Sequence, residues 1–338
     1  MSTAVGGPYF DELEVGMTFE TAPAVTLTDG LAAAHRTILG DRLRLPLDHG
    51  LSQQVTGEPT PLASPGLVWD LAIGQSTLAT HHVKANLFYR GLRFLRFPHI
   101  GDTLRTRTEV VGLRDNAPKP GRAATGLAAL HMTTSDQHGR TVLDFYRCAM
   151  LPVGPDAASD RVLRDHDLST IGVSPDDAPE AAGAPEWAVP KEWDLATYRT
   201  RTGAAAATDE LVGHSFITSG DVVSSAPELA RLSLNIAAVH HDERVGGSRL
   251  VYGGHTIGLA LAQLTRALPD LVTILGWESC DHTGPVREGD TLTSQIEVLG
   301  HTSLEQGAAL HLRSLVTAHR AGADPAPVLD WRYTALVP

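Results

Sequence analysis

The sequence has little of several features that define other classes of protein. Its 338 residues contain only two cysteines, Cys148 and Cys280, too few for a disulfide scaffold or a four-cysteine zinc site. No apolar run approaches the roughly 18 residues that cross a bilayer. The first ten residues lack the cationic and apolar regions of a signal peptide. We therefore expect a cytoplasmic protein.

Positive charge is also scarce. The chain has 27 Lys and Arg against 39 Asp and Glu, for a net charge of −12. A general binder of nucleic acid or anionic membranes needs a basic face, so we expect neither partner. One stretch departs from this balance, because residues 71–101 carry Lys84, Arg90, Arg93 and Arg96 and no acidic residue. It predicts either a local site for an anionic small molecule or a solvent-facing strand that pairs with neighbouring acids.

What the sequence does contain is a repeat of very long period, and such repeats determine the architecture. Three motifs appear in the same order in both halves of the chain. They are Val-Gly-x-Thr/Ser-Phe at 15–19 and 212–216, Gly-Asp-Thr-Leu at 101–104 and 289–292, and Val-Leu-Asp at 142–144 and 328–330. The sequence therefore predicts two copies of one domain, residues 8–153 and 193–338, joined by a Pro- and Ala-rich linker of residues 154–192. The offsets place a short insertion in the first copy, around 43–60.

Each copy reads as helices followed by strands. In the second copy we expect a helix over 225–236 with Ser225 as its cap, and another from Gly253 to just before Pro269. After these helices we expect strands at 292–298, 310–317 and 328–337. The first copy has matching patterns, which predict helices from about Thr28 and about Gly66 and strands at 103–111, 125–134 and 141–151. This order predicts an α+β fold in which an antiparallel sheet wraps around a central helix. That is the hotdog architecture, and two in one chain make a double hotdog.

The common cofactor and metal motifs are absent. The chain has no Rossmann fingerprint, no P-loop and no Gly-x-Ser-x-Gly nucleophile elbow. The clusters at 240–242 and 280–282 contain ligand-type residues without a recognised metal spacing. We therefore expect no metal and no separate cofactor.

Three motifs in the second copy carry a resemblance to a known family. They are Asn235-Ile-Ala-Ala-Val-His240, Val251-Tyr-Gly-Gly254 and Gly284-Pro-Val-x-x-Gly289-Asp-Thr-Leu292. In this order they resemble the MaoC-like, (R)-specific enoyl-CoA hydratases, in the double-hotdog form of actinobacteria, and more loosely mesaconyl-CoA hydratase. The resemblance covers both copies. It implies addition of water to an enoyl-CoA, or its removal from a 3-hydroxyacyl-CoA, with coenzyme A as part of the substrate.

The resemblance also implies a role for each matching residue. His240 would take a proton from water and return it, which suits an imidazole. Asn235 stands where the family has Asp and would hold the water. The N–H of Gly254, at a helix start, would stabilise the negative charge that develops on the thioester oxygen. Further residues are expected to bind the substrate, the three arginines through the phosphates of coenzyme A: Tyr252, Gly253, His255, Arg90, Arg93 and Arg96.

The amide at position 235 is a departure from the family. An amide can orient a water but cannot accept a proton at neutral pH. Catalysis would then rest on His240, unless another group helps, such as Asp281 or His282 on the next strand. The first copy departs further, because Pro46 stands where a His is needed and His49 has the wrong spacing. We expect the first copy to supply part of the wall of the pocket for the acyl chain; the alternative is that it only packs against the second copy.

Two classes of function remain open from the sequence. The first is a hydro-lyase acting on a CoA or carrier-protein thioester, of which a hotdog thioesterase is an enzymatic variant. The second is an acyl-CoA-binding protein without turnover, which Asn235 suggests. Beyond the pseudo-dimer that two fused hotdogs form, a homodimer is also expected.

Overall fold

The structure is a computed structural model and describes residues 6–172, 187, 189–205, 209–245 and 247–338. Among these residues, the strands form one continuous antiparallel sheet in the order β1-β4-β5-β6-β3-β9-β12-β11-β10-β7. The long strands are β3 (Ala85–Phe94), β4 (Thr103–Asp115), β5 (Thr125–Ser135), β6 (Thr141–Pro152), β9 (Thr273–His282), β10 (Thr291–Ser303), β11 (Ala308–His319) and β12 (Ala326–Val337). The short strands β1 (Thr18–Phe19) and β2 (Val25–Thr26) pair with β4, and β7 (Ser215–Ile217) and β8 (Asp221–Val222) pair with β10.

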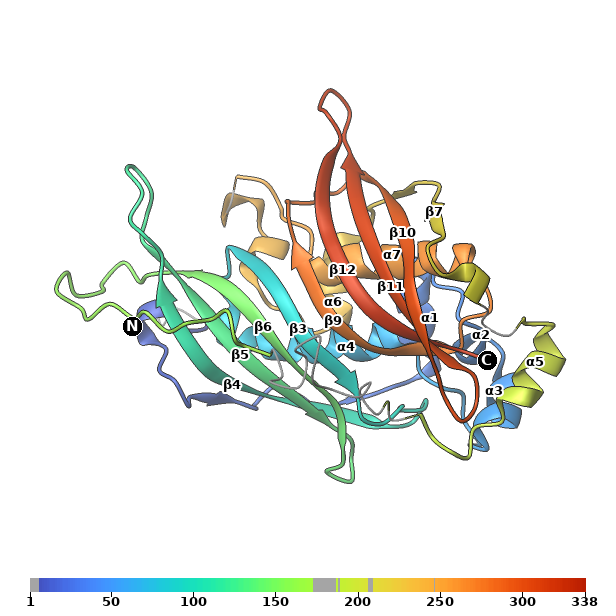
Figure 1. Cartoon of the computed structure of the whole chain (residues 1–338). Helices are drawn as coiled ribbons and strands as arrows, with labels where there is room; N and C mark the ends of the chain where they lie inside the picture. The colour runs from blue at the N-terminus through green and yellow to red at the C-terminus, as the bar shows by residue number, and fades with distance from the viewer. Residues whose placement is uncertain (1–5, 173–186, 188, 206–208, 246) are drawn as a thin grey trace.

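The strand order reads the same from either end of the sheet, as the repeat requires. From the outer edge inward, the long strands of the first half are β4, β5, β6 and β3, and those of the second half are β10, β11, β12 and β9. The first long strand of each half, β3 or β9, therefore lies at the centre, where the two pair with each other. Tyr89 lies opposite Cys280 in this central pair. Figure 1 shows the two halves as curved blades, green to cyan and orange to red, joined along β3 and β9. The strands predicted from alternating patterns are all confirmed, and most extend beyond the predicted ends.

Two buried helices occupy the concave side of the sheet. They are α4 (Pro65–Gln75) and α7 (Gly253–Ala267), which pack against each other. Every residue of α4 is buried, as are those of α7 from Gly254 to Thr265. A helix that is apolar on all sides needs such an environment, since no face can be left to solvent. The architecture is the predicted double hotdog. No helix of the described residues is long and apolar enough to cross a membrane.

The helix predicted over 225–236 is shorter than expected. Ser225 has a left-handed φ of 57° and makes no capping hydrogen bond, so its predicted role as cap is wrong. The Glu288 carboxylate accepts from the N–H of Ala226 instead. The helix, α6 (Ala226–Leu232), ends because Leu234 turns to a φ of 61°. The backbone of residue 233 there approaches α4 so closely that only a glycine fits at Gly74. This turn brings Asn235 to the centre of the molecule.

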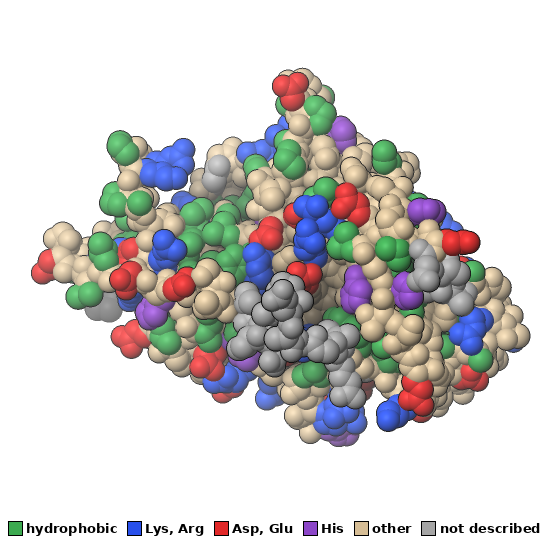
Figure 2. All heavy atoms as spheres, in the orientation of Figure 1, with side chains coloured by type: hydrophobic (Ala, Val, Ile, Leu, Met, Phe, Trp, Pro, Cys, Tyr) green, Lys and Arg blue, Asp and Glu red, His purple; other side chains and the backbone are tan. Residues whose placement is uncertain are grey.

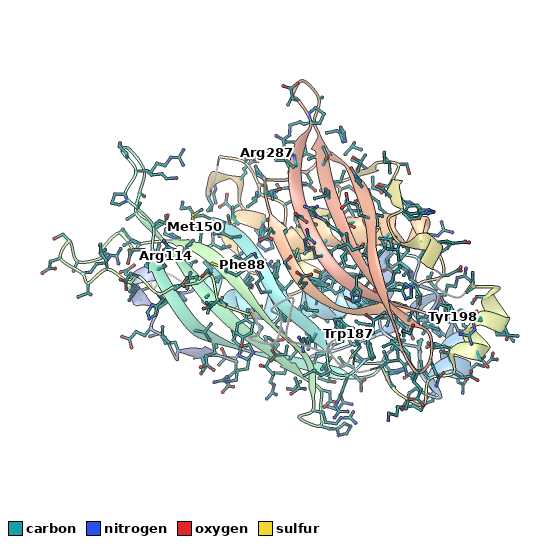
Figure 3. The ribbon with its side chains drawn as sticks, viewed as in Figure 1. Phe88, Arg114, Met150, Trp187, Tyr198 and Arg287 are labelled. Carbon is teal, nitrogen blue, oxygen red and sulfur yellow. The ribbon has the colours of Figure 1, made fainter. Side chains whose placement is uncertain are left out.

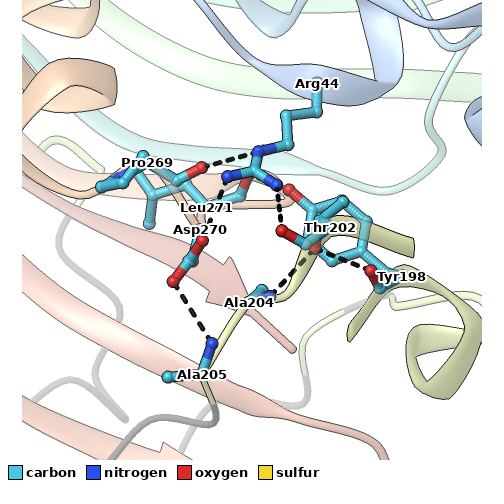
Figure 4. Close-up of polar contacts among 8 residues, drawn as sticks. All are labelled: Arg44, Tyr198, Thr202, Ala204, Ala205, Pro269, Asp270 and Leu271. Atoms are coloured by element: carbon cyan, nitrogen blue, oxygen red, sulfur yellow. Dashed lines mark hydrogen bonds and ion pairs between the residues drawn. The ribbon is translucent and has the colours of Figure 1, made fainter. Parts of the chain in front are cut away.

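The insertion in the first copy connects the two halves. The helix predicted from Thr28 is confirmed as α1 (Asp29–Leu39), capped by the Thr28 hydroxyl, and α2 (Arg44–Leu47) and α3 (His49–Thr56) follow it. Arg44 donates hydrogen bonds to the carbonyl oxygens of Pro269 and Thr202 and to the carboxylate of Asp270, at 3.1 to 3.3 Å (Figure 4). Thr202 ends α5 (Leu195–Thr202), so one guanidinium joins three segments.

The predicted linker is only partly within the described residues, because 173–186 and 188 lie outside them. Its described beginning is not a free connection. Arg161 forms an ion pair with Asp115 of β4, and Arg164 donates to the backbone oxygen of Phe10. Leu168 is buried against Ala129 of β5 and Cys148 of β6, in the first half of the sheet. The remaining short helices are η1 (Phe10–Glu12), η2 (Ser76–Thr80), η4 (Asp209–Leu211), η5 (Ala238–His240) and η6 (Glu243–Val245).

Candidate active site

A cavity of about 240 Å³ lies where the two halves meet, and both halves line it. The first half contributes residues of β3, β6 and η2, and the second contributes the loop before α7, the start of α7 and the end of β9. The polar side chains in its wall are Thr77, Lys84, Asn86, Tyr89, Arg147, Asn235, His240, Tyr252, Thr256, His282 and Thr283. No Asp or Glu of the described residues is among the lining residues, so the cavity carries positive charge in an acidic protein.

His240 reaches the cavity from η5 and is 8% exposed. Its Nδ1 lies 2.8 Å from the carbonyl oxygen of Leu250. Because a carbonyl oxygen only accepts, Nδ1 carries the hydrogen, and in the neutral ring Nε2 keeps a free lone pair. Burial lowers the pKa of His240 to about 4. The ring is therefore neutral at physiological pH and its Nε2 can accept a proton.

Asn235 lies in the wall of the same cavity and is 2% exposed. Its Oδ1 accepts a hydrogen bond from the N–H of Ala237 at 3.0 Å. The side-chain oxygen is thereby engaged with the backbone, which leaves the NH₂ group as a donor. His241 reinforces this geometry, because its Nε2 is 2.7 Å from the Asn235 carbonyl oxygen. The NH₂ group of Asn235 is thus available as a hydrogen-bond donor, and Nε2 of His240 as an acceptor, in the wall of the same cavity.

The first turn of α7 closes one side of the cavity. A helix start has N–H groups without intrahelical acceptors, and Gly253 and Gly254 are the first two residues of this helix. Gly253 lines the cavity, and a methyl group there would lie 2.6 Å from Nε2 of His282. Gly254 is not a lining residue. A methyl group on it would lie 2.1 Å from the Asp70 carboxylate, on the side of α4.

The predicted substrate-binding residues separate into two groups. Tyr252 and Gly253 line the cavity, and the Tyr252 hydroxyl donates to the buried carboxylate of Asp70 at 3.1 Å. His255 is fully buried and outside the wall, because it points from α7 toward the protein interior. Of the expected active-site residues, His240, Asn235, Tyr252 and Gly253 come together, and Gly254 lies directly behind them.

The three arginines predicted to contact coenzyme A, Arg90, Arg93 and Arg96, are not in the cavity wall. Arg90 follows the inward-facing Tyr89 on β3, so its side chain takes the opposite face of the sheet. There it pairs with Asp281 at 2.7 Å and stacks on Phe88, a β3 residue labelled in Figure 3. On the face shown in Figure 2, basic side chains lie interspersed with acidic ones. For Arg90 this geometry favours the alternative in which the cation pairs with a neighbouring acid.

Other cations lie closer to the cavity. Lys84 belongs to the cavity wall and also lines an adjoining hollow with His82 and Arg287. Arg287 is in the connection between β9 and β10 and is labelled in Figure 3. Of the acid-free stretch, therefore, Lys84 rather than the arginines reaches the site.

Three important lining residues were missed or only mentioned at the sequence level. His282 is half-buried, burial of its ring lowers its pKa to about 4, and its Nε2 has no hydrogen-bond partner among the described residues. Arg147 and Tyr89 face each other on β6 and β3. A signal for Arg147 existed, because it occupies an inward position of an alternating strand, between Phe145 and Ala149.

None of the matching residues of the first copy lines the cavity. His49 is exposed, and Asp41 is buried with a carboxylate that accepts from the Ser64 hydroxyl at 3.2 Å. Burial raises the pKa of Asp41. Gly66 packs against the ring of His35. The repeat places Trp277 and Tyr333 where the first half has Tyr89 and Arg147. Aromatic rings fill the space around them, as the centroid distances show: Trp69 to Trp277, 4.9 Å; Trp277 to Trp331, 5.5 Å; Trp331 to Tyr333, 3.7 Å.

Comparisons with known proteins find two curated relatives that match the chain over almost its whole length. The chain is 30% identical to β-methylmalyl-CoA dehydratase of Chloroflexus aurantiacus over 98% of this chain and 97% of that one. It is 26% identical to mesaconyl-CoA hydratase of Cereibacter sphaeroides, over 98% of both. No protein-family model matches the chain.

Two solved structures share the fold over almost the whole chain. RV0216 from Mycobacterium tuberculosis, described as having a double hotdog fold, is 60% identical with a TM-score of 0.91 and 99% coverage of both chains. A putative MaoC domain protein dehydratase from Chloroflexus aurantiacus is 29% identical with a TM-score of 0.80, covering 100% of this chain and 99% of that one. The predicted double hotdog is confirmed.

Proposed function

Because this chain belongs to the MaoC-like double-hotdog family of hydratases and dehydratases, we propose that it adds water to, or removes water from, the C2–C3 bond of a CoA thioester in the cavity between its halves. The observation that carries this proposal is the pair formed by His240 and Asn235. They present a proton acceptor and a hydrogen-bond donor to one enclosed space beside a helix N-terminus.

The pair can hold and activate one water molecule. The NH₂ group of Asn235 donates to the water oxygen, and Nε2 of His240 accepts one of its hydrogens. In hydration the water oxygen bonds to C3 while the proton moves to Nε2, and the electrons of the double bond move toward the thioester carbonyl. His240 then returns the proton to C2, so that one water is added and His240 ends neutral as it began. Dehydration is the reverse sequence.

The start of α7 stabilises the enolate oxygen of this reaction. The unpaired N–H groups of Gly253 and Gly254 and the positive end of the helix dipole favour a negative charge there. Gly253 lines the cavity directly, and the absence of a side chain lets the carbonyl approach the backbone. The role predicted for Gly254 is thus shared with Gly253 in this proposal.

The assay incubates the pure chain with short enoyl-CoA thioesters. Loss of the enoyl absorbance without release of free thiol supports hydration. Release of thiol would identify a thioesterase, and saturable binding without either change would identify an acyl-CoA-binding protein. The variant His240→Ala is expected to lower kcat/KM by about 10²- to 10⁴-fold, the range of a general base. Full activity in this variant would refute the assignment of the base.

Asn235 provides a second test of the mechanism. If His240 is already the proton acceptor, Asn235→Asp raises the hydration rate by no more than about threefold. A rise of about tenfold or more would show that the amide limits catalysis. An acyl-carrier thioester assayed beside the CoA thioester identifies the carrier. Light scattering of the pure protein tests the expected homodimer. The reaction as written needs no metal and no cofactor, since coenzyme A is part of the substrate.

A further inference from the structure

One buried carboxylate has no part in the mechanism above. Asp70 is the only ionisable residue of α4, the central helix of the first half, and it is 0% exposed. An Asp is almost never fully buried unless its carboxylate is paired. The same helix of the second half does without it, because the repeat places Gly258 at the matching position of α7 and Leu39 occupies the space there. The presence of this carboxylate therefore needs an explanation other than the fold of the helix.

Both oxygens of the Asp70 carboxylate are hydrogen-bonded. Oδ2 lies 2.9 Å from Nε2 of His35, a residue of α1 that is 1% exposed. Oδ1 accepts from the hydroxyl of Tyr252 at 3.1 Å. Because a carboxylate oxygen only accepts, His35 and Tyr252 are the donors, and each holds one side of the carboxylate in place. Asp70 thus connects two helices of the first half to a residue of the second half.

The same carboxylate lies against the start of α7. Tyr252 is the residue immediately before this helix and lines the cavity, with its ring centroid 5.8 Å from that of His240. A methyl group on Gly254 would lie 2.1 Å from Oδ1 of Asp70, so the backbone of this glycine packs against the carboxylate. The N–H groups of Gly253 and Gly254 lie along the chain between these two contacts. Asp70 therefore fixes the chain on both sides of the donors that the proposed reaction uses.

We propose that Asp70 is a positioning residue, which through Tyr252 and Gly254 holds the first turn of α7 so that its N–H groups lie at the right distance from the thioester oxygen. The inference rests on the proposed function and gives the first half a part in catalysis besides the cavity wall. Stabilisation of a developing negative charge needs donors at about 2.7 to 3.1 Å from the oxygen. A misplacement of about 1 Å can lower a rate about a hundredfold, so a support behind the donors is reflected in the rate.

The test removes this hydrogen bond from either side and measures hydration of crotonyl-CoA, or of mesaconyl-CoA if the unaltered chain does not hydrate crotonyl-CoA. Asp70→Leu replaces the carboxylate by an apolar group and is expected to lower kcat about tenfold to a hundredfold, with KM changed less than about threefold. Tyr252→Phe removes the donor and is expected to lower kcat equally. Asp70→Asn keeps an acceptor for the Tyr252 hydroxyl, so its kcat stays within about threefold of the unaltered chain. A loss in Asp70→Asn as large as in Asp70→Leu would overturn the proposal.

A double variant and a control make the result specific. The kcat of Asp70→Leu/Tyr252→Phe is expected to lie within about twofold of either single variant, because both changes remove the same bond. Losses that multiply, or full kcat in Asp70→Leu, would overturn the proposal. Gln263→Leu is the matched control, because Gln263 is a fully buried polar residue of the same helix that donates to Asp221 and Leu292. It is expected to lower the melting temperature and to leave kcat and KM unchanged.

Hydrogen exchange separates this inference from the proposed function. If no enoyl-CoA is hydrated, the proposed function fails, and deuterium exchange of the amides of residues 251–256 then tests the support of α7 in the free protein. Exchange is expected to be about tenfold or more faster in Asp70→Leu and Tyr252→Phe than in the unaltered chain, and unchanged in Asp70→Asn and Gln263→Leu. If Asp70→Leu does not fold, Tyr252→Phe, which breaks the same bond, is compared in both measurements. Equal exchange in all variants would overturn the inference.

Discussion

The buried histidines make the stability of this protein depend on pH, and His255 allows that dependence to be measured away from the active site. His255 is fully buried in α7, and neither ring nitrogen has a partner among the described residues. Burial lowers its pKa from 6.5 to about 4. The unfolded chain therefore binds a proton at this residue near pH 6.5, whereas the folded chain does so only near pH 4. Between these values the unfolded state binds more protons, so stability falls as the pH falls.

The size of the effect follows from the two pKa values. At pH 7.5 the ring is neutral in both states and the contribution is close to zero. At pH 5 the ring is protonated in the unfolded chain and neutral in the folded one, which lowers the free energy of unfolding by about 2 kcal/mol. Below pH 4 the loss levels off at about 3 kcal/mol. His240 and His282 have pKa values lowered to about 4 as well, so the whole protein is expected to be acid-sensitive.

The experiment is urea unfolding of the unaltered chain and of His255→Leu at pH 7.5 and pH 5. Leucine keeps most of the volume and removes the group that titrates. The variant is expected to lose about 2 kcal/mol less stability than the unaltered chain between the two pH values. His138→Leu, at an exposed turn position between β5 and β6, is the matched control and keeps the full dependence. An identical loss of stability in His255→Leu and the unaltered chain would refute the reasoning.

Three further predictions follow from the same structure. The hydration kcat/KM is expected to stay level from pH 8 to about 5.5 and to fall about tenfold per pH unit below 4, because His240 becomes protonated there. A fall centred near pH 6.5 in the pH–rate profile would contradict the lowered pKa of His240. Gly253→Ala places a methyl group 2.6 Å from the His282 ring, so the hydration kcat/KM is expected to fall about tenfold or more. The melting temperature of the variant checks that it folds. Arg44→Met removes three hydrogen bonds that join the two halves. It is expected to lower the free energy of unfolding, measured in urea titrations, by about 1 to 3 kcal/mol. An unchanged free energy of unfolding would show that these bonds of α2 do not stabilise the contact between the halves.

Much of the site could be predicted where its residues are close in the chain. Asn235 and His240 are five residues apart, and the loop that carries them folds back on α6, so a local motif brings both to the cavity. The helix start at Gly253 was equally visible, because two glycines precede an apolar run. The cap expected of Ser225 was wrong, because Ser225 has a left-handed φ and the carboxylate of Glu288, distant in the chain, accepts from the N–H of Ala226 instead.

The strands show the limit of such reasoning. The predicted strands did not include β3, and the acid-free stretch that contains it did not show that Tyr89 faces the cavity while Arg90 pairs with Asp281 on the opposite face. Which face of a strand is inward depends on its partners, since a shift of one residue exchanges the faces. The positive charge of residues 71–101 therefore suggested the arginines, whereas the structure places Lys84 at the cavity.

The sequence by itself determined the repeat, the two central helices, the long strands other than β3 and β9, and the pairing of Asn235 with His240. These features depend on periodicity and on residues near one another in the chain. The tertiary structure alone decided that Arg147 of the first half lies in the same cavity as His240 of the second. That meeting depends on the pairing of β3 with β9, about 190 residues apart, which joins two half-sites into one. It also decided that the candidate residues of the second copy line this cavity while the matching residues of the first copy do not.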